Sequence, residues 1–190
     1  MSKDERVEAV LDAAYTCFTR HGVRRTTMDD IARAAGMSRP AVYQHVRNKE
    51  DAFHRLVERM LDDALEATRQ ALAQGGEPAP RILGALRPKL EMVMRVWHDS
   101  PAHAAELLAV DARLSGELLA HYDETMRGLL RDALRHSGLG PDSAETAELL
   151  LALTRGLEAD PTDPQTAFGL LGRGVELMIA GLTAGRETTP

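Results

Sequence analysis

Residues 26–49, with the sequence TTMDDIARAAGMSRPAVYQHVRNK, constrain the fold of this 190-residue chain more than any other stretch. Their pattern predicts two short helices joined by a tight turn. Thr27 and Asp30 have the spacing of a capping box at the start of the first helix. Gly36 suits a left-handed turn, and Ser38 is placed to cap the second helix. The stretch therefore predicts a helix-turn-helix unit.

The second of these helices is predicted to have one buried and one exposed side. Pro40 is tolerated there because it falls in the first turn, where backbone N–H groups have no intrahelical partner. Val42 and Val46 face inward at i, i+4, which leaves long hydrogen-bonding side chains outside: Arg39, Tyr43, Gln44 and His45. A buried seam opposite such a polar face is typical of a helix that reads DNA.

The charge distribution favours the same interpretation. The whole chain carries a net charge of −6, which by itself would argue against a nucleic-acid partner. Between Arg20 and Lys49, however, seven basic residues stand against two acidic ones, a net charge of +5, so the remaining residues carry −11. A basic patch on an acidic body is typical of a DNA-binding module joined to another domain.

The chain is long enough to bury a sizeable core without a disulfide or a metal ion. Its single cysteine, Cys17, rules out an internal disulfide and is interpreted as a small buried hydrophobe in a reducing compartment. No uncharged run approaches the length of a membrane span, and no signal peptide is recognisable. We therefore expect a cytoplasmic protein without membrane contact.

Helical periodicity extends over the whole chain. A capped helix is predicted from Ser2 to His21, with Gly22 ending it. Lys49–Ala73 is predicted as one helix of about 37 Å, which is long enough to leave the DNA-binding part and enter a second domain. The Gly- and Pro-rich residues 75–80 are the best candidate for a boundary loop.

The segment after residue 80 is also helical in pattern. Pro88 marks a kink or a break, and the long leucine-rich stretch that follows should break near Ser115–Gly116 or a few residues earlier. Further helices should start near Asp142 and follow residues 160–164, the last running to about Ala184. No alternating β-branched segment occurs, so the predicted fold class is all-α.

The N-terminal part of the chain resembles a known protein family. Phe18-x-x-x-Gly22, Thr26 to Ala32, Ala35 to Ser38, Tyr43 and Lys49 to Phe53 are similar to the pattern of TetR-family transcriptional regulators. The similarity covers residues 4–63, where many positions match at fixed spacing. The chain departs from the pattern at Val46, where an aromatic residue is usual, and at Pro40, where a small residue or lysine is more common.

The resemblance implies a domain organisation and a function. It implies a helix-turn-helix DNA-binding domain of three helices at 1–48 and a helical ligand-binding and dimerisation domain at 49–190, joined by a long helix. It also implies a homodimer on a palindromic operator in double-stranded DNA, and a repressor released by a small, largely apolar effector. Two alternatives remain: a DNA-binding dimer of the same fold without a small ligand, and an all-α protein-interaction module.

The resemblance also implies site residues. Thr27, Tyr43, His45 and Lys49 are expected to contact phosphates, with Arg24 or Arg25 supplementing them. Arg39 and Gln44 are expected to read bases by the general chemistry of arginine with guanine and glutamine with adenine. Ser38 and Pro40, at the start of the recognition helix, complete the predicted DNA-binding set. Candidate residues for the ligand pocket are Met92, Met94, Trp97, His98, Leu108, Tyr122 and Met126, although plain core packing is an alternative for each.

The last two helices are predicted to form the dimer interface. Four glycines in the last helix would permit close approach of a partner helix, although a terminal helix packed inside the protomer is an alternative. The predicted interface residues are Leu150, Leu153, Leu157, Phe168, Leu171, Gly172, Val175, Met178 and Leu182. Four histidines, His98, His103, His121 and His136, lack metal-ligand spacing, and there is no phosphate-binding loop or nucleophile elbow. We therefore predict no enzyme activity, no metal and no cofactor.

Overall fold

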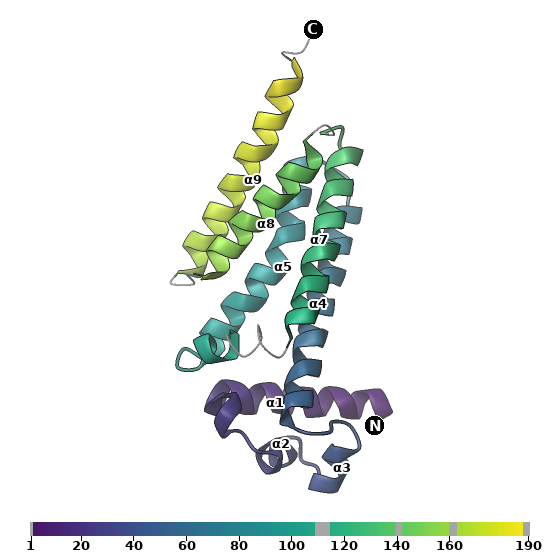
Figure 1. The fold of residues 1–190 in the computed structure, drawn as a ribbon, viewed down its shortest axis with the longest axis vertical. Helices are drawn as coiled ribbons and strands as arrows, with labels where there is room; N and C mark the ends of the chain where they lie inside the picture. The colour runs from purple at the N-terminus through teal and green to yellow at the C-terminus, as the bar shows by residue number, and fades with distance from the viewer. Residues whose placement is uncertain (1, 109–114, 140–141, 160–162, 188–190) are drawn as a thin grey trace. The chain divides into compact units, whose positions relative to one another are not determined.

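The computed structural model describes residues 2–108, 115–139, 142–159 and 163–187. These residues form helices, turns and short connections without a β-strand, so the predicted all-α fold class is confirmed (Figure 1). The chain divides into two compact units. The first consists of Met1–Leu61 with Arg95–Leu119, and the second of Asp62–Met94 with Ala120–Pro190.

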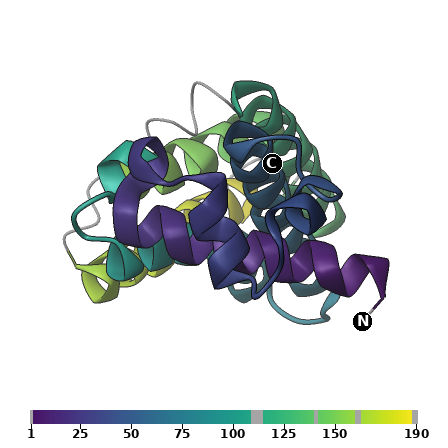
Figure 2. The same ribbon diagram turned by 90° about the horizontal axis from the view of Figure 1, so that it is seen from below.

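The first unit contains three N-terminal helices, α1 (Lys3–Arg25), α2 (Met28–Ala34) and α3 (Arg39–Tyr43), and the first part of α4 (Lys49–Ala73). In this unit α2 packs against α1, and α3 packs against α2 (Figures 1 and 2). The rings of Phe18 in α1 and Phe53 in α4 meet edge to face, with their centroids 5.6 Å apart. Ile31 in α2 and Val42 in α3 are also fully buried. This core is what fixes α2 and α3 in place.

The second unit contains the rest of α4 with parts of α5 (Pro78–Asp99) and α7 (Gly116–His136), and all of α8 (Ser143–Ala159) and α9 (Pro164–Glu187). Its core consists of large side chains from α5, α7, α8 and α9 that are fully buried: Ile82, Leu86, Leu90, Met126, Leu130, Leu134, Leu150 and Leu171. The buried Thr68 hydroxyl donates a hydrogen bond to the carbonyl oxygen of Ala85 at 2.8 Å, which ties α4 to α5.

Most predicted helix ends agree with the structure. Gly22 has φ +75° and ψ 159°, so it interrupts helical geometry where the sequence predicts an end, and a short helical segment then runs to Arg25. Pro88 does not break α5, which runs through it to Asp99. As predicted, α7 begins at Gly116.

The two compact units do not follow the predicted boundary at residues 48 and 49. That boundary coincides with the start of α4, whereas the units divide inside this helix, between Leu61 and Asp62. The first unit also takes in residues 95–119, which the sequence pattern had placed wholly in the C-terminal domain. The reason is physical, since hydrogen bonds link this later segment to α1. The Tyr15 hydroxyl donates to the Asp99 carboxylate at 2.6 Å, and the Ser100 hydroxyl donates to the carbonyl oxygen of Thr19 at 2.6 Å.

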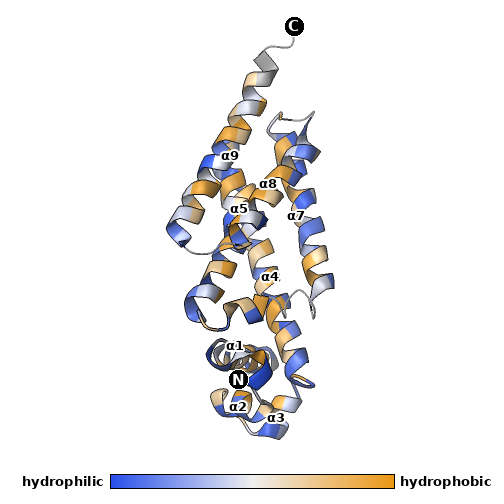
Figure 3. Ribbon diagram, turned by 60° about the vertical axis from the view of Figure 1, so that its left-hand side comes forward, coloured by the Kyte–Doolittle hydropathy of each residue, from blue (hydrophilic) through white to orange (hydrophobic). Residues whose placement is uncertain are grey.

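Helix α9 is unusually apolar for its exposure. Over Pro164–Ala184 it is long and apolar enough to cross a membrane by length and composition alone, and only 22% of its most apolar window is buried within the chain. Apolar residues recur along α8 and α9 (Figure 3). Composition does not distinguish a membrane span from a helix that packs against a protein partner.

Candidate DNA-binding site

Local hydrogen bonds build the first half of the candidate site. The Thr27 side chain accepts a hydrogen bond from the backbone N–H of Asp30, while the Asp30 carboxylate accepts bonds from the Thr27 N–H at 3.1 Å and its hydroxyl at 2.6 Å. These bonds, led by the one from the Thr27 hydroxyl, lower the pKa of the Asp30 carboxyl. The predicted capping box is therefore present, and α2 begins where the sequence predicts.

The turn between α2 and α3 has the backbone geometry that the glycine at residue 36 predicts. Gly36 has φ +63°, in the left-handed region that favours glycine. The N–H of Met37 donates to the carbonyl oxygen of Ala32 at 3.0 Å, and that of Gly36 to Arg33 at 3.2 Å, which satisfies the free carbonyls at the end of α2. The Ser38 hydroxyl then accepts from the N–H of Ala41 and caps α3.

Helix α3 is shorter than the sequence pattern predicts. It ends at Tyr43, and Gln44, His45 and Val46 follow it. Val42 in the helix and Val46 after it are 0% and 1% exposed, so both are buried as predicted, although an aromatic residue is usual at position 46. Arg39, Pro40, Tyr43 and Gln44 are exposed. His45 is half-buried, and its Nδ1 is buried without a hydrogen-bond partner among the described residues.

The exposed arginine of α3 is held by its neighbours. The Arg39 guanidinium lies 3.3 Å from the Asp29 carboxylate, and it donates a hydrogen bond to the Tyr43 hydroxyl at 3.4 Å. Its central carbon also lies 5.6 Å from the centre of the Tyr43 ring. All three side chains are exposed to solvent, so a DNA phosphate or base edge could replace these contacts. Asp29 was not among the predicted site residues.

Arg25 and Lys49 lie near the end of α1 rather than on α3. The Lys49 ammonium donates hydrogen bonds to the carbonyl oxygens of Arg24 at 2.9 Å and Thr26 at 3.2 Å. Arg25 donates to the carbonyl oxygen of His21 at 3.1 Å and lies 3.3 Å from Nε2 of His103. Both cations therefore have partners within the first unit, which the sequence pattern did not predict.

The seven predicted pocket residues are divided between the two units. Met92, Met94, Tyr122 and Met126 are buried in the second unit, where Tyr122 and Met126 line one small cavity. The other three, Trp97, His98 and Leu108, belong to the first unit; Trp97 and Leu108 are half-buried and His98 is exposed. No cluster of metal-ligating side chains occurs among the residues that the structure describes.

The predicted dimer residues differ in their burial. Three of them, Leu150, Leu171 and Val175, are completely buried inside the protomer and have no surface to offer a partner. The others are half-buried: Leu153, Leu157, Phe168, Gly172, Met178 and Leu182. The most exposed leucines on α8 and α9 are instead Leu149, Leu170 and Leu177, at 51%, 53% and 57%.

Comparison with known proteins decides the family. Residues 10–56 match the model of the bacterial regulatory proteins of the tetR family. The chain is 30% identical to the HTH-type transcriptional repressor BepR of Brucella suis, over 90% of this chain and 87% of that protein. It is also 30% identical to the probable HTH-type transcriptional regulator ArpR of Pseudomonas putida, over 90% and 82% of the two chains. The chain belongs to the TetR family.

Other relatives match over part of their length, and solved structures share the fold. In three further matches, at 30–41% identity, the chain spans only 31–53% of the relative's length. A transcriptional regulator from Pseudomonas aeruginosa PAO1 has the same fold, with a TM-score of 0.74 at 21% identity over 97% of this chain and 93% of that one. SmeT, solved as a complex with triclosan, superposes with a TM-score of 0.65 at 22% identity over 95% and 91% of the two chains.

Proposed function

We propose that this TetR-family protein is a cytoplasmic, homodimeric repressor that binds a palindromic operator in double-stranded DNA and is released by a small, largely apolar ligand. The observation that carries the proposal is the contrast in burial along α3 and the residues that follow it. Arg39, Tyr43 and Gln44 are exposed, whereas Val42 and Val46 are buried, in the part of the chain with a net charge of +5. Such a helix presents hydrogen-bonding groups to a major groove while its other side is anchored.

Within this proposal the residues have distinct roles. Arg39 and Gln44 would contact base edges, and Tyr43 and His45 would contact phosphates. Thr27 sits at the N-terminus of α2, where free N–H groups and the helix dipole favour an anion. Arg25 and Lys49 would supplement the backbone contacts, and Ser38 and Pro40 would set the start of the reading helix. In a C2 dimer, two such helices would enter major grooves about 34–36 Å apart.

The test is a binding titration with DNA that flanks the protein's own gene, at fixed salt. Arg39→Ala and Tyr43→Phe are each expected to weaken binding; for Arg39, loss of a bidentate contact with guanine costs about 1–3 kcal/mol. Arg69→Ala is the matched control, because Arg69 is half-exposed on α4 in the second unit. Unchanged binding by both variants of α3 would refute the assignment of the recognition helix.

One observation favours a second candidate, a DNA-binding dimer that takes no small ligand. The cavity beside Tyr122 and Met126 has a volume of only about 10 Å³, which is room for about one water molecule. The triclosan complex of SmeT supports the ligand-released alternative by similarity of fold alone. A thermal-shift screen separates the two candidates, because a ligand at 100 times its Kd adds about 2.7 kcal/mol to stability. A ligand that stabilises the protein and releases it from DNA supports the repressor proposal.

A further inference from the structure

Helix α3 is too short to hold an orientation by itself. It consists of the five residues Arg39–Tyr43, whereas an isolated helix shorter than about 12 residues is marginal in water. The turn that follows adds only two local bonds, because the N–H groups of His45 and Val46 both donate to the carbonyl oxygen of Val42, at 2.9 Å and 3.1 Å. Contacts with other parts of the first unit must therefore fix the angle at which α3 presents its exposed side chains.

One such contact comes from α4. The guanidinium of Arg55 donates a hydrogen bond through Nη1 to the carbonyl oxygen of His45 at 2.5 Å, across ten residues of sequence. Both residues are half-buried and belong to the first unit. A backbone carbonyl outside a regular helix needs a donor from elsewhere, and a charged donor forms a stronger bond than a neutral one. Arg55 therefore ties the turn after α3 to the second turn of α4.

The start of α4 is itself well fixed, which gives Arg55 a firm base. The Asn48 side chain accepts a hydrogen bond from the N–H of Asp51 at 2.7 Å. The Asp51 carboxylate accepts from the backbone N–H of Arg47 at 2.8 Å and from its guanidinium at 2.7 Å, and the Asp51 side chain is only 10% exposed. Asp51 and Arg55 are four residues apart, so the same side of α4 holds the chain at His45 and again at Arg47.

Arg55 is unlike the residues that are expected to touch DNA. It is half-buried and donates to a backbone carbonyl of its own chain, whereas Tyr43 and Gln44 are exposed. The carbonyl that it holds belongs to the residue directly after Gln44, so a movement at this point would also move Gln44 and Tyr43. The position of these side chains matters for base contacts, because recognition of a base edge depends on where donors and acceptors lie.

We propose that Arg55 is a positioning residue for DNA recognition, which holds the carbonyl oxygen of His45 and thereby fixes the angle of α3 in the major groove. Arg55 contacts neither base nor phosphate and acts through Gln44 and Tyr43. The inference rests on the proposed function, since α3 must be the helix that reads DNA. It predicts a loss of sequence specificity rather than a general loss of affinity, because attraction to phosphates does not depend on base contacts.

The experiment titrates full-chain variants with two duplexes of equal length, one from the DNA that flanks the protein's own gene and one of unrelated sequence. Arg55→Met removes the donors and keeps an apolar stem. It should weaken binding to the flanking duplex about tenfold and to the unrelated duplex less than about twofold, so the affinity ratio falls. The slope of log affinity against log salt should stay unchanged. Arg55→Lys keeps a charged donor and should restore part of the ratio.

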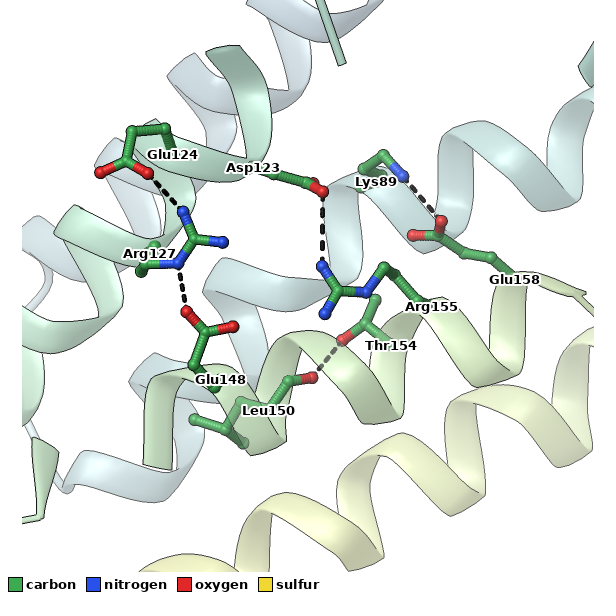
Figure 4. A network of polar contacts seen from close by, with 9 residues as sticks. All are labelled: Lys89, Asp123, Glu124, Arg127, Glu148, Leu150, Thr154, Arg155 and Glu158. Atoms are coloured by element: carbon green, nitrogen blue, oxygen red, sulfur yellow. Dashed lines mark hydrogen bonds and ion pairs between the residues drawn. The ribbon is translucent and has the colours of Figure 1, made fainter. Parts of the chain in front are cut away.

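Arg59→Met is the matched control. Arg59 is also a half-buried arginine of α4, one turn further on, but it binds Glu8 at 2.5 Å and Asp12 at 2.9 Å on α1. A second control, Arg127→Met, removes an arginine that joins α7 to α8 in the second unit (Figure 4). Both controls should keep the wild-type affinity ratio.

Two results of these titrations would overturn the inference. A control that lowers the ratio as much as Arg55→Met would mean that general loosening of the protein is responsible. A salt slope reduced by about 0.9 in Arg55→Met would mean that Arg55 contacts a phosphate directly. Should Arg55→Met lose helix content in circular dichroism, Arg55→Gln, whose shorter side chain cannot reach the carbonyl oxygen of His45, must meet the same expectations.

Hydrogen exchange of the unbound protein tests the contact without DNA. The amides of His45 and Val46 should exchange at least about fivefold faster in Arg55→Met and at the wild-type rate in Arg59→Met. Unchanged exchange in Arg55→Met overturns the inference. The titrations separate this failure from failure of the proposed function. If the wild type binds both duplexes alike, the proposed function fails, and the role of Arg55 in recognition fails with it. If the wild type discriminates and Arg55→Met does so equally well, only the role of Arg55 is wrong.

Discussion

The guanidinium of Arg39 lies 3.3 Å from the carboxylate of Asp29, at the surface proposed to face DNA. Both side chains are more than half exposed, so solvent screens the pair and it contributes little to folding stability. Its effect on the proposed DNA binding is different, because a base contacted by Arg39 would replace Asp29 as its partner. The unbound protein therefore holds this proposed base-reading side chain in an arrangement that DNA binding would break.

Asp29→Asn is therefore expected to tighten DNA binding. The substitution frees Arg39 and removes a negative charge beside the phosphates, and a gain of up to about 1 kcal/mol corresponds to about fivefold in affinity. Fluorescence anisotropy with labelled operator DNA at fixed salt measures it. Asp62→Asn removes another exposed charge, in the second unit, and should have no such effect. Weaker binding by Asp29→Asn would mean that Asp29 orients Arg39 for DNA.

Lys49→Ala is expected to reduce the free energy of unfolding as well as DNA affinity. Its ammonium satisfies two carbonyl oxygens at the end of α1, those of Arg24 and Thr26, and Lys49 is half-buried. Hydrogen bonds from a charged donor to such groups are worth about 1–2 kcal/mol here. Urea denaturation measures the loss, with the highly exposed Arg33→Ala as control. Unchanged stability would leave Lys49 with a phosphate-binding role alone.

The contrast between these residues shows which features the sequence could predict. The caps formed by Thr27 with Asp30, by Ser38, and by Asn48 with Asp51 depend on groups three residues apart, so local chemistry decides them. The partners of Arg39 and Lys49 lie 10 and 25 residues away from them. Sequence spacing does not indicate these contacts, because tertiary packing is what brings the groups together.

The C-terminal helices show a second limit. Leucines occur on several sides of α8 and α9, so periodicity does not decide which side faces the core. Leu150 and Leu171 were predicted for the dimer interface but are completely buried, whereas their neighbours Leu149 and Leu170 are exposed. A shift of one residue rotates a helical position by about 100° and exchanges core for surface. The sequence could therefore predict that each helix has an apolar face, but not which residues lie on its buried side.

Gly22 and Gly128 should respond in opposite directions to alanine substitution. Gly22 has φ +75°, and an added Cβ would lie 2.7 Å from a carboxylate oxygen of Glu106. Gly22→Ala should therefore lower the free energy of unfolding by about 1–2 kcal/mol. Gly128 lies inside α7 with open space around it, so Gly128→Ala should raise it by about 0.5–1 kcal/mol. Chemical denaturation measures both, and equal signs would contradict this account of Gly22.

The capping box of α2 should make the free energy of unfolding depend on pH under acidic conditions. Its hydrogen bonds from Thr27 lower the pKa of Asp30 in the folded state, so folding favours the carboxylate form. The contribution is complete above the unfolded pKa of about 3.9 and is lost as the pH falls through the lower folded value. The stability difference between the wild type and Asp30→Asn should therefore shrink below pH 4. A difference that persists at pH 2 would mean that the carboxylate is not the stabilising form.

The exposed leucines of α8 and α9 give the proposed dimer its sharpest test. Leu170 and Leu177 are seven residues apart, two helical turns, so they lie on the same side of α9, and each is more than half exposed. An apolar face of this kind on a helix as apolar and as little buried as α9 is expected to be covered by a second subunit. Leu177→Glu should place a charge in that interface and shift the protein from dimer to monomer.

Analytical ultracentrifugation over a range of concentrations measures the shift, with circular dichroism to establish that helix content is retained. Glu66→Lys, on the exposed side of α4, is the control and should leave the dimer intact. In the proposed dimer, the DNA-binding domains of the two subunits bind two half-sites together. The monomeric variant should therefore also lose most of its operator affinity while retaining an intact α3. A Leu177→Glu protein that remains a dimer at the same concentrations would place the subunit interface elsewhere.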